Sequence, residues 1–116
     1  MSIVALILII VVALLHGYFM LLEMALWTRP VGLQVFHQTR ERAEQTQVLA
    51  ANQGLYNGFI AVGLVFAVIT EQRDVVLLFL GFVVIAGIYG GLTVNQRIAL
   101  VQAVPAVLAI LAVLFT

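Results

Sequence analysis

Two ionisable side chains lie within a stretch of sequence that is otherwise apolar enough for the interior of a lipid bilayer. They are His16 and Glu23, in the segment LLHGYFMLLEMALW at residues 14–27. Placing a charged side chain in hydrocarbon costs about 2.5–3.5 kcal/mol on the milder insertion scales, so such residues usually serve a site. On one helix the two side chains share a face and lie about 10.5 Å apart. We therefore assign them as candidate catalytic groups that exchange protons with a molecule held between them.

A second group of polar side chains is expected at a similar depth and provides candidate ligand contacts. Its members are amides, phenols and one hydroxyl, at Asn52, Gln53, Tyr56, Asn57, Tyr89, Thr93 and Gln102. Asn52 and Tyr56 are four positions apart and so share a helix face, which we expect to point into the bundle. The alternative is that the amides only join helices, at about 0.6 kcal/mol each. Ligand binding is favoured because three amides and a phenol within six positions exceed what holding one helix requires.

The composition defines the class of protein. Of 116 residues, 65% are hydrophobic and 9% charged, and the mean hydropathy is +1.22, all far from the values of a soluble domain. The chain has no cysteine, which excludes disulfides and thiolate metal sites. Its formal net charge is zero, so nucleic acid is not an expected partner. With one carboxylate among the apolar segments, no metal site and no cofactor are predicted.

Four apolar segments are near the length that crosses a bilayer. They lie at residues 2–27, 48–69, 75–93 and 98–115. The last three are joined by very short links, which require antiparallel neighbours. Helices are expected because open strand edges cannot stay unpaired in lipid. The predicted fold is all-α: an integral membrane four-helix antiparallel bundle that forms a single transmembrane domain over residues 1–116.

Arginine placement predicts the orientation of the four segments. The connection at residues 28–47 contains Arg29, Arg40 and Arg42, and the last link contains Arg97. The opposite side has only Arg73. The excess places residues 28–47 in the cytoplasm and both termini on the extracytoplasmic side of the cell (inner) membrane. The polar side chains then fall in the cytoplasmic half or near the midplane, which predicts a polar intramembrane cavity that faces the cytoplasm.

The long connection is expected to contain some structure. Pro30 can begin a new helix, which would place the apolar side chains Val31, Leu33, Val35 and Phe36 on the membrane surface. The mixed charges of RERAEQTQ, at residues 40–47, can extend the second spanning helix into water. In that helix and the third, glycines spaced four apart predict close helix packing and favour a homo-oligomer. Those pairs are Gly54 with Gly58 and Gly87 with Gly91.

Four motifs in order resemble a known family. They are HGYFMLLEMALW at 16–27, NQGLYNGF at 52–59, GIYGGLT at 87–93 and VQAVPA at 101–106. Together they make the chain similar, over nearly its whole length, to the membrane family called domain of unknown function 1304. The resemblance implies a four-helix protein of about this length. Some members carry the label epimerase, which implies an isomerase-type membrane enzyme as one candidate activity, and no catalytic residue is carried over.

The residues therefore support one function ahead of two alternatives. The first is a site that binds a small lipophilic molecule and can transform it by acid–base chemistry through His16 and Glu23. The second is a proton-coupled transporter that acts as an oligomer, and the third is a structural subunit that binds a partner helix. A transport path needs polar groups near the midplane and beyond, and the outer half of each segment is almost entirely apolar. Transport is therefore the weaker alternative.

Overall fold

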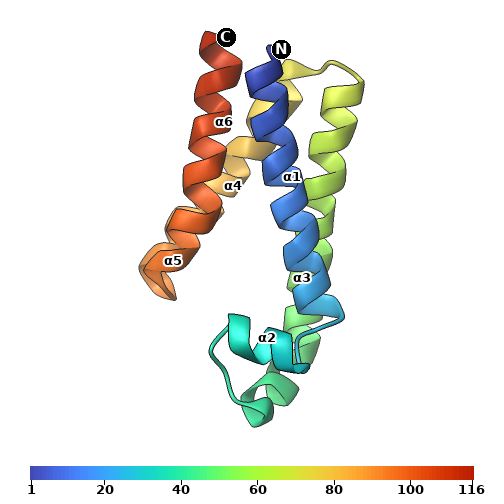
Figure 1. The fold of residues 1–116 in the computed structure, drawn as a ribbon, viewed down its shortest axis with the longest axis vertical. Helices are drawn as coiled ribbons and strands as arrows, with labels where there is room; N and C mark the ends of the chain where they lie inside the picture. Colours follow the sequence, from blue (N-terminus) through green and yellow to red (C-terminus); the bar gives the residue numbers. More distant parts are fainter. The chain divides into compact units, whose positions relative to one another are not determined.

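The computed structural model describes all 116 residues, and every regular element is helical. In chain order these are α1 (Ile3–Met24), α2 (Pro30–Val35), α3 (Arg40–Ile69), α4 (Arg73–Thr93), α5 (Gln96–Ile98), the π-helical turn η1 (Ala99–Ala103) and α6 (Val104–Phe115) (Figure 1). Four stretches are long and apolar enough to cross a membrane, namely α1, α3, α4 and the run Gln96–Phe115. The predicted all-α class, with four candidate spans, is confirmed.

The chain forms two compact units. One contains Met1–Leu14 together with Val62–Thr116, and the other contains Leu15–Ala61. Helices α1 and α3 each begin in one unit and end in the other. The first unit has a core of small and branched apolar side chains, including Ile9, Leu64 and Leu80, which are fully buried.

Helix α3 begins earlier than its apolar segment suggests. It starts at Arg40 rather than near Val48, because the charged run between them consists mostly of good helix formers. The Thr39 hydroxyl accepts a hydrogen bond of 3.2 Å from the Arg42 backbone N–H, which caps the first turn. At the other end Glu71 adopts a left-handed φ of 54°, and the Gln72 N–H reaches the Ala67 carbonyl at 2.8 Å. This closes α3 in the manner of a Schellman motif.

The last apolar run contains a π-helical turn just before its proline. The Val104 N–H bonds the Ala99 carbonyl, five residues earlier. Pro105 follows as an early residue of α6 and has no N–H to donate, so one backbone hydrogen bond of the helical pattern is absent there. The irregular turn also carries Gln102, which is half-buried. Sequence reasoning places a kink at Pro105, and the structure shows a widened turn immediately before it.

Glycines bring α4 close to the helices that follow it within the first unit. A Cβ on Gly87 would lie 2.8 Å from the Ala103 nitrogen, and one on Gly91 would lie 2.6 Å from the Ala99 Cβ. Small residues on both sides allow this approach, as is common between helices in lipid. The packing role predicted for the pair Gly87 and Gly91 is confirmed.

Gly87→Ala is expected to lower the melting temperature of the protein in detergent. The added Cβ would overlap the backbone of Ala103, which cannot rotate aside, and overpacking of this kind costs about 1–3 kcal/mol. Gly81→Ala is the matched control, since nothing lies within 4 Å of a Cβ at Gly81. Equal melting temperatures for the two variants would show that α4 does not need this close approach.

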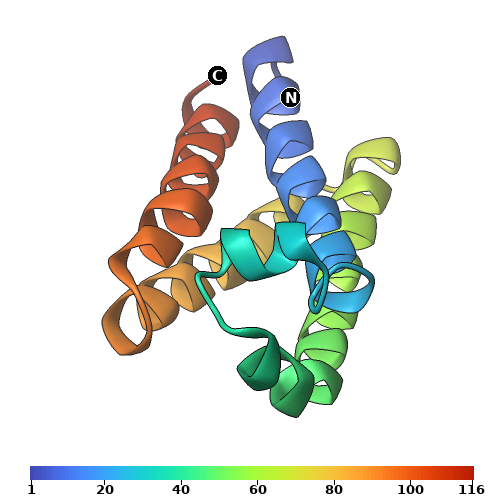
Figure 2. The same cartoon turned by 60° about the horizontal axis from the view of Figure 1, so that its bottom comes forward.

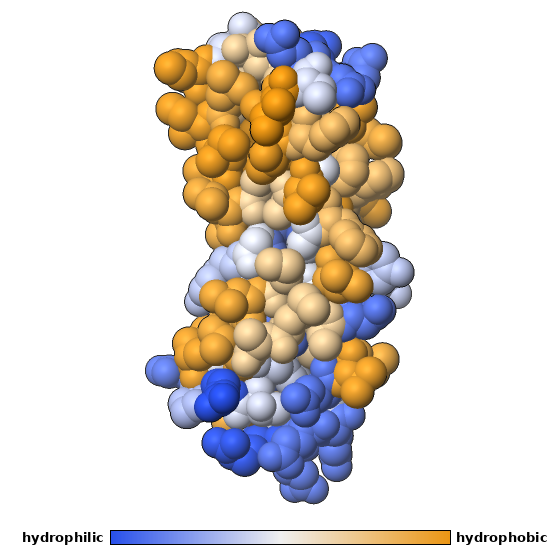
Figure 3. Space-filling model, turned by 90° about the vertical axis from the view of Figure 1, so that its right-hand side faces the viewer, coloured by the Kyte–Doolittle hydropathy of each residue, from blue (hydrophilic) through white to orange (hydrophobic).

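Large apolar side chains are exposed on all the long helices. Leu14, Val62 and Leu92 are exposed by 69%, 70% and 82%. Figure 3 shows apolar side chains over much of the surface on one face. Helices that are apolar on every face are typical of membrane spans, and so large an apolar surface is unusual in a soluble protein.

Candidate functional site

The candidate site residues are divided between the two units. The unit Leu15–Ala61 contains His16, Glu23, Asn52, Gln53, Tyr56 and Asn57. The other unit contains Tyr89, Thr93 and Gln102. The first set includes both ionisable side chains and therefore defines the centre of the candidate site.

Glu23 and Asn57 are joined by a hydrogen bond between α1 and α3. The Asn57 Nδ2 donates to Glu23 Oε1. The Glu23 side chain is buried, with 6% of its surface exposed. A buried carboxyl is costly unless it is hydrogen-bonded, and the Asn57 amide supplies that bond. The structure thus brings together one candidate catalytic group and one candidate ligand contact.

Two glycines of α3 allow this approach. A Cβ on Gly54 would lie 3.0 Å from the Glu23 Cβ and 3.2 Å from the Met20 carbonyl oxygen. A Cβ on Gly58 would lie 2.6 Å from the Met20 Sδ. The glycines therefore form the surface against which α1 packs, and they bring Asn57 within reach of Glu23. The packing role predicted for this second glycine pair is confirmed.

His16 is buried on the same helix as Glu23. Its side chain is 3% exposed, and its ring contacts that of Phe19 edge-to-face, with centroids 5.4 Å apart. Met20 lies between His16 and Glu23 in the sequence and packs against Gly58. The predicted gap between the two ionisable groups therefore adjoins a methionine side chain. Methionine side chains are flexible and adapt to irregular spaces.

The other polar residues of α3 are exposed, contrary to the expectation that they point inward. Asn52, Gln53 and Tyr56 all lie on the surface, and Tyr56 is 60% exposed. At about 100° per residue, Asn52 and Tyr56 lie roughly opposite the face of Gly54 and Gly58. Because the glycine face packs on α1, the side of α3 that carries Asn52 and Tyr56 is turned away from that contact.

The three candidate residues of the other unit are not buried either. Tyr89 is 70% exposed, and Thr93 is exposed one turn later. The Thr93 hydroxyl donates to the Tyr89 backbone carbonyl at 2.7 Å, so it already has an acceptor within its own helix. Gln102 lies half-buried in η1.

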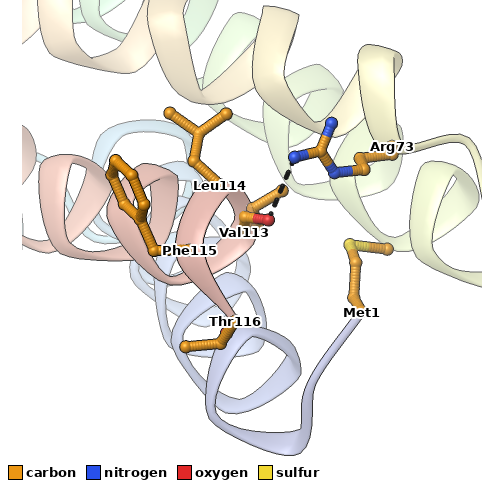
Figure 4. Close-up of a pocket in the computed structure, with 6 residues that line it drawn as sticks. All are labelled: Met1, Arg73, Val113, Leu114, Phe115 and Thr116. Carbon is orange, nitrogen blue, oxygen red and sulfur yellow. Dashed lines mark hydrogen bonds between the residues drawn. The ribbon is translucent and has the colours of Figure 1, made fainter.

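Two open hollows occur in the first unit. One, of about 400 Å³, is lined by Met1, Arg73 and residues 113–116, and the Arg73 Nη2 donates to the Val113 carbonyl at 3.3 Å (Figure 4). The other, of about 360 Å³, is lined by Met1, Leu6, Val68, Glu71 and Arg73. Neither is lined by a candidate site residue. No group of three or more His, Asp or Glu side chains is arranged to hold a metal ion.

These features define a class of all-helical protein with four helices apolar enough to span a membrane. The chain belongs to the family described as "Protein of unknown function (DUF1304)", which matches residues 10–114. It is also 36% identical over 119 residues to "Uncharacterized protein YpaA" of Lactococcus lactis subsp. lactis (strain IL1403), covering 99% of this chain and 100% of that protein. No solved structure matches. The family resemblance predicted from the four motifs is confirmed.

Proposed function

We propose that the protein is an integral membrane protein that binds a small lipophilic molecule at a site centred on Glu23 and Asn57. The observation that carries the proposal is the buried Glu23 carboxyl, held by an amide from another helix. A carboxyl and an amide together offer both donors and acceptors, so they can bind a hydroxyl or carbonyl group on an otherwise apolar molecule. His16, two turns along the same helix, is the second ionisable group of the site.

The polar face of α3 supports access to this site from the lipid side. At about 100° per residue, Gln53 lies about 40° from Asn57 and about 60° from Tyr56 around the helix. Exposed hydrogen-bonding groups therefore lead round α3 from the lipid-facing Tyr56 to the half-buried Asn57, which donates to Glu23. A ligand that diffuses in the bilayer can exchange its contacts along this arc, while Met20 moves to admit its apolar part.

We place the site in the cytoplasmic half of the membrane, with both termini extracytoplasmic. The support is the arginine excess in residues 28–47. The chain has no cysteine, so single cysteines report orientation cleanly. A membrane-impermeant maleimide is expected to label Ser2→Cys in intact spheroplasts and to label Gln45→Cys only after lysis. The reverse pattern would place the connection outside and contradict the proposed orientation.

The binding proposal is tested by the molecules that copurify with the protein. We expect lipophilic compounds extracted from the purified wild type to include one or a few that are roughly tenfold depleted in Glu23→Gln or Asn57→Leu, the loss expected when a hydrogen bond to a charged or buried group is removed. The matched control is Glu71→Gln, which alters an exposed carboxyl. Identical extracts from all four proteins would contradict ligand binding and favour a purely structural hydrogen bond between α1 and α3.

A further inference from the structure

The short helix α2 is held tightly against the turn that follows α1. A Cβ on Gly32 would lie 2.0 Å from the Leu26 carbonyl oxygen and 3.0 Å from the Trp27 carbonyl oxygen. Only glycine permits this approach. Figures 1 and 2 show α2 set across the direction of α1, next to the point where α1 ends. The helix is therefore fixed in place at the end of a candidate membrane span.

Trp27 joins the same region to α3. Its ring contacts that of Phe36, with centroids 4.8 Å apart, and its Nε1 donates to the Thr46 hydroxyl at 3.1 Å. Tryptophan is enriched where a membrane span meets the headgroup layer. This contact links the end of α1, the end of α2 and the first turns of α3 into one packed structure.

Helix α2 also carries apolar side chains that are partly exposed. Val31 and Val35 are spaced four apart on one face and are exposed by 43% and 41%, while Phe36 is 38% exposed. Gly32 instead faces the backbone of the preceding turn. A helix that is fixed by one side and presents valines on another has a surface suited to the boundary between headgroups and acyl chains.

Arginines flank this apolar surface. Arg29 directly precedes α2. The Arg40 Nη1 donates to the Thr28 carbonyl at 3.3 Å, so a second guanidinium lies at the backbone of the residue before Arg29. Arg42 follows on α3, and all three arginines are exposed. The acidic residues in residues 28–47 are Glu41 and Glu44, so positive charge is in excess. Guanidinium groups at this position suit the phosphates of anionic lipids.

We propose that residues 27–42 form an interfacial anchor that binds anionic phospholipid headgroups of the cytoplasmic leaflet. The inference rests on the membrane insertion included in the proposed function. Helix α1 has 22 residues, about 33 Å at 1.5 Å each, which matches a hydrocarbon core of about 30 Å. The segment directly after α1 therefore lies at the headgroup layer, with Val31 and Val35 toward the acyl chains and the arginines toward phosphate.

Nitroxide labels on single cysteines test where α2 lies. The protein is reconstituted in vesicles of three parts phosphatidylcholine to one part phosphatidylglycerol, and the labels are probed with oxygen and a water-soluble nickel chelate. Labels at Val31 and Val35 are expected to be more accessible to oxygen than to nickel, and a label at exposed Glu44 the reverse. Ile7, exposed on α1, reports insertion. If the labels at Val31 and Val35 are accessible to nickel while the label at Ile7 is accessible to oxygen, the anchor alone is overturned. If the label at Ile7 is also accessible to nickel, membrane insertion is overturned as well.

The lipid preference is tested with Trp27, the only tryptophan in the chain. At equal mole fractions, brominated phosphatidylglycerol is expected to quench Trp27 more than brominated phosphatidylcholine, through a several-fold local enrichment of the anionic lipid. Arg29→Gln with Arg40→Gln should abolish the difference, while the matched control Arg97→Gln should retain it. Equal quenching by both lipids in the wild type, or an unchanged preference in the double variant, would overturn the proposed headgroup contact.

Discussion

Asn57→Leu is expected to reduce the free energy of unfolding by about 1–3 kcal/mol, because it leaves the buried Glu23 carboxyl without the amide that donates to it. The loss should appear as unfolding at lower denaturant in detergent micelles. Asn52→Leu is the matched control, since it makes the same replacement on the same helix at an exposed position. Equal losses from the two variants would show that the bond to Glu23 contributes no stability.

A double-mutant cycle separates the hydrogen bond from the other effects of the substitution. Glu23→Leu removes the acceptor, so adding Asn57→Leu to it should cost less than the same change in the wild type. Coupling energies of this kind between membrane helices average about 0.6 kcal/mol, with a maximum of about 1.7 kcal/mol. Additive losses would contradict a direct interaction between the two side chains.

Gly54→Leu should destabilise the protein at least as strongly, because it forces α1 and α3 apart. The first atom of the new side chain would lie 2.8 Å from the Met24 Cγ and 3.0 Å from the Glu23 Cβ. Overpacking costs about 1–3 kcal/mol and occasionally more, and here it also separates Asn57 from Glu23. Thermal unfolding, followed by the fluorescence of Trp27, measures the loss.

Gly17→Leu provides the comparison for Gly54→Leu. Gly17 lies on α1, and nothing is within 4 Å of a Cβ built there. A larger side chain should therefore be accepted with little change in melting temperature. If Gly17→Leu and Gly54→Leu unfold at the same temperature, the close packing of α1 on α3 at Gly54 is not a source of stability.

The helical class and the candidate spans follow directly from long apolar runs, which only helices can place in lipid. The beginning of α3 at Arg40 agrees with the extension expected from the mixed-charge run, although hydropathy gives no signal from Arg40 to Gln47. There the helix depends on residue propensity and on the Thr39 cap, which are local effects. The docking of α2 through Gly32 could not be predicted from the sequence, because it depends on a contact with the Leu26 backbone that no periodic pattern encodes.

Only part of the site was predictable from the sequence, because the sequence does not decide which face of α3 packs against α1. The sequence of this helix offers two faces for packing, one with Gly54 and Gly58 and one with Asn52 and Tyr56. The polar side chains favour the face with Asn52 and Tyr56 as the inner one. The small size of glycine, which lets two helix backbones approach closely, favours the face with Gly54 and Gly58. The glycine face packs on α1, so Asn57 at its edge meets Glu23 while Asn52 and Tyr56 are exposed. The burial of both His16 and Glu23 agrees with their predicted position on one face of the first helix.

The same packing changes the basis for expecting an oligomer. Gly54 and Gly58 contact Met20, and Gly87 and Gly91 contact Ala103 and Ala99, all within the chain. These glycines are therefore not free to join copies of the protein. A homo-oligomer remains a prediction. In such an oligomer, a second copy of the protein would form hydrogen bonds with the exposed amides and phenol of α3.

The most direct test of the central claim is whether a small lipophilic reagent reaches Glu23 from the bilayer. Dicyclohexylcarbodiimide partitions into membranes and modifies carboxyl groups there, and mass spectrometry of peptides locates the modified residue. We expect modification at Glu23 in the wild type and none at that position in Glu23→Gln, while exposed Glu71 and Asp74 react instead with a water-soluble carbodiimide. Glu23 that stays unmodified by the lipophilic reagent in folded protein, yet reacts after unfolding, would contradict a site open to lipophilic molecules.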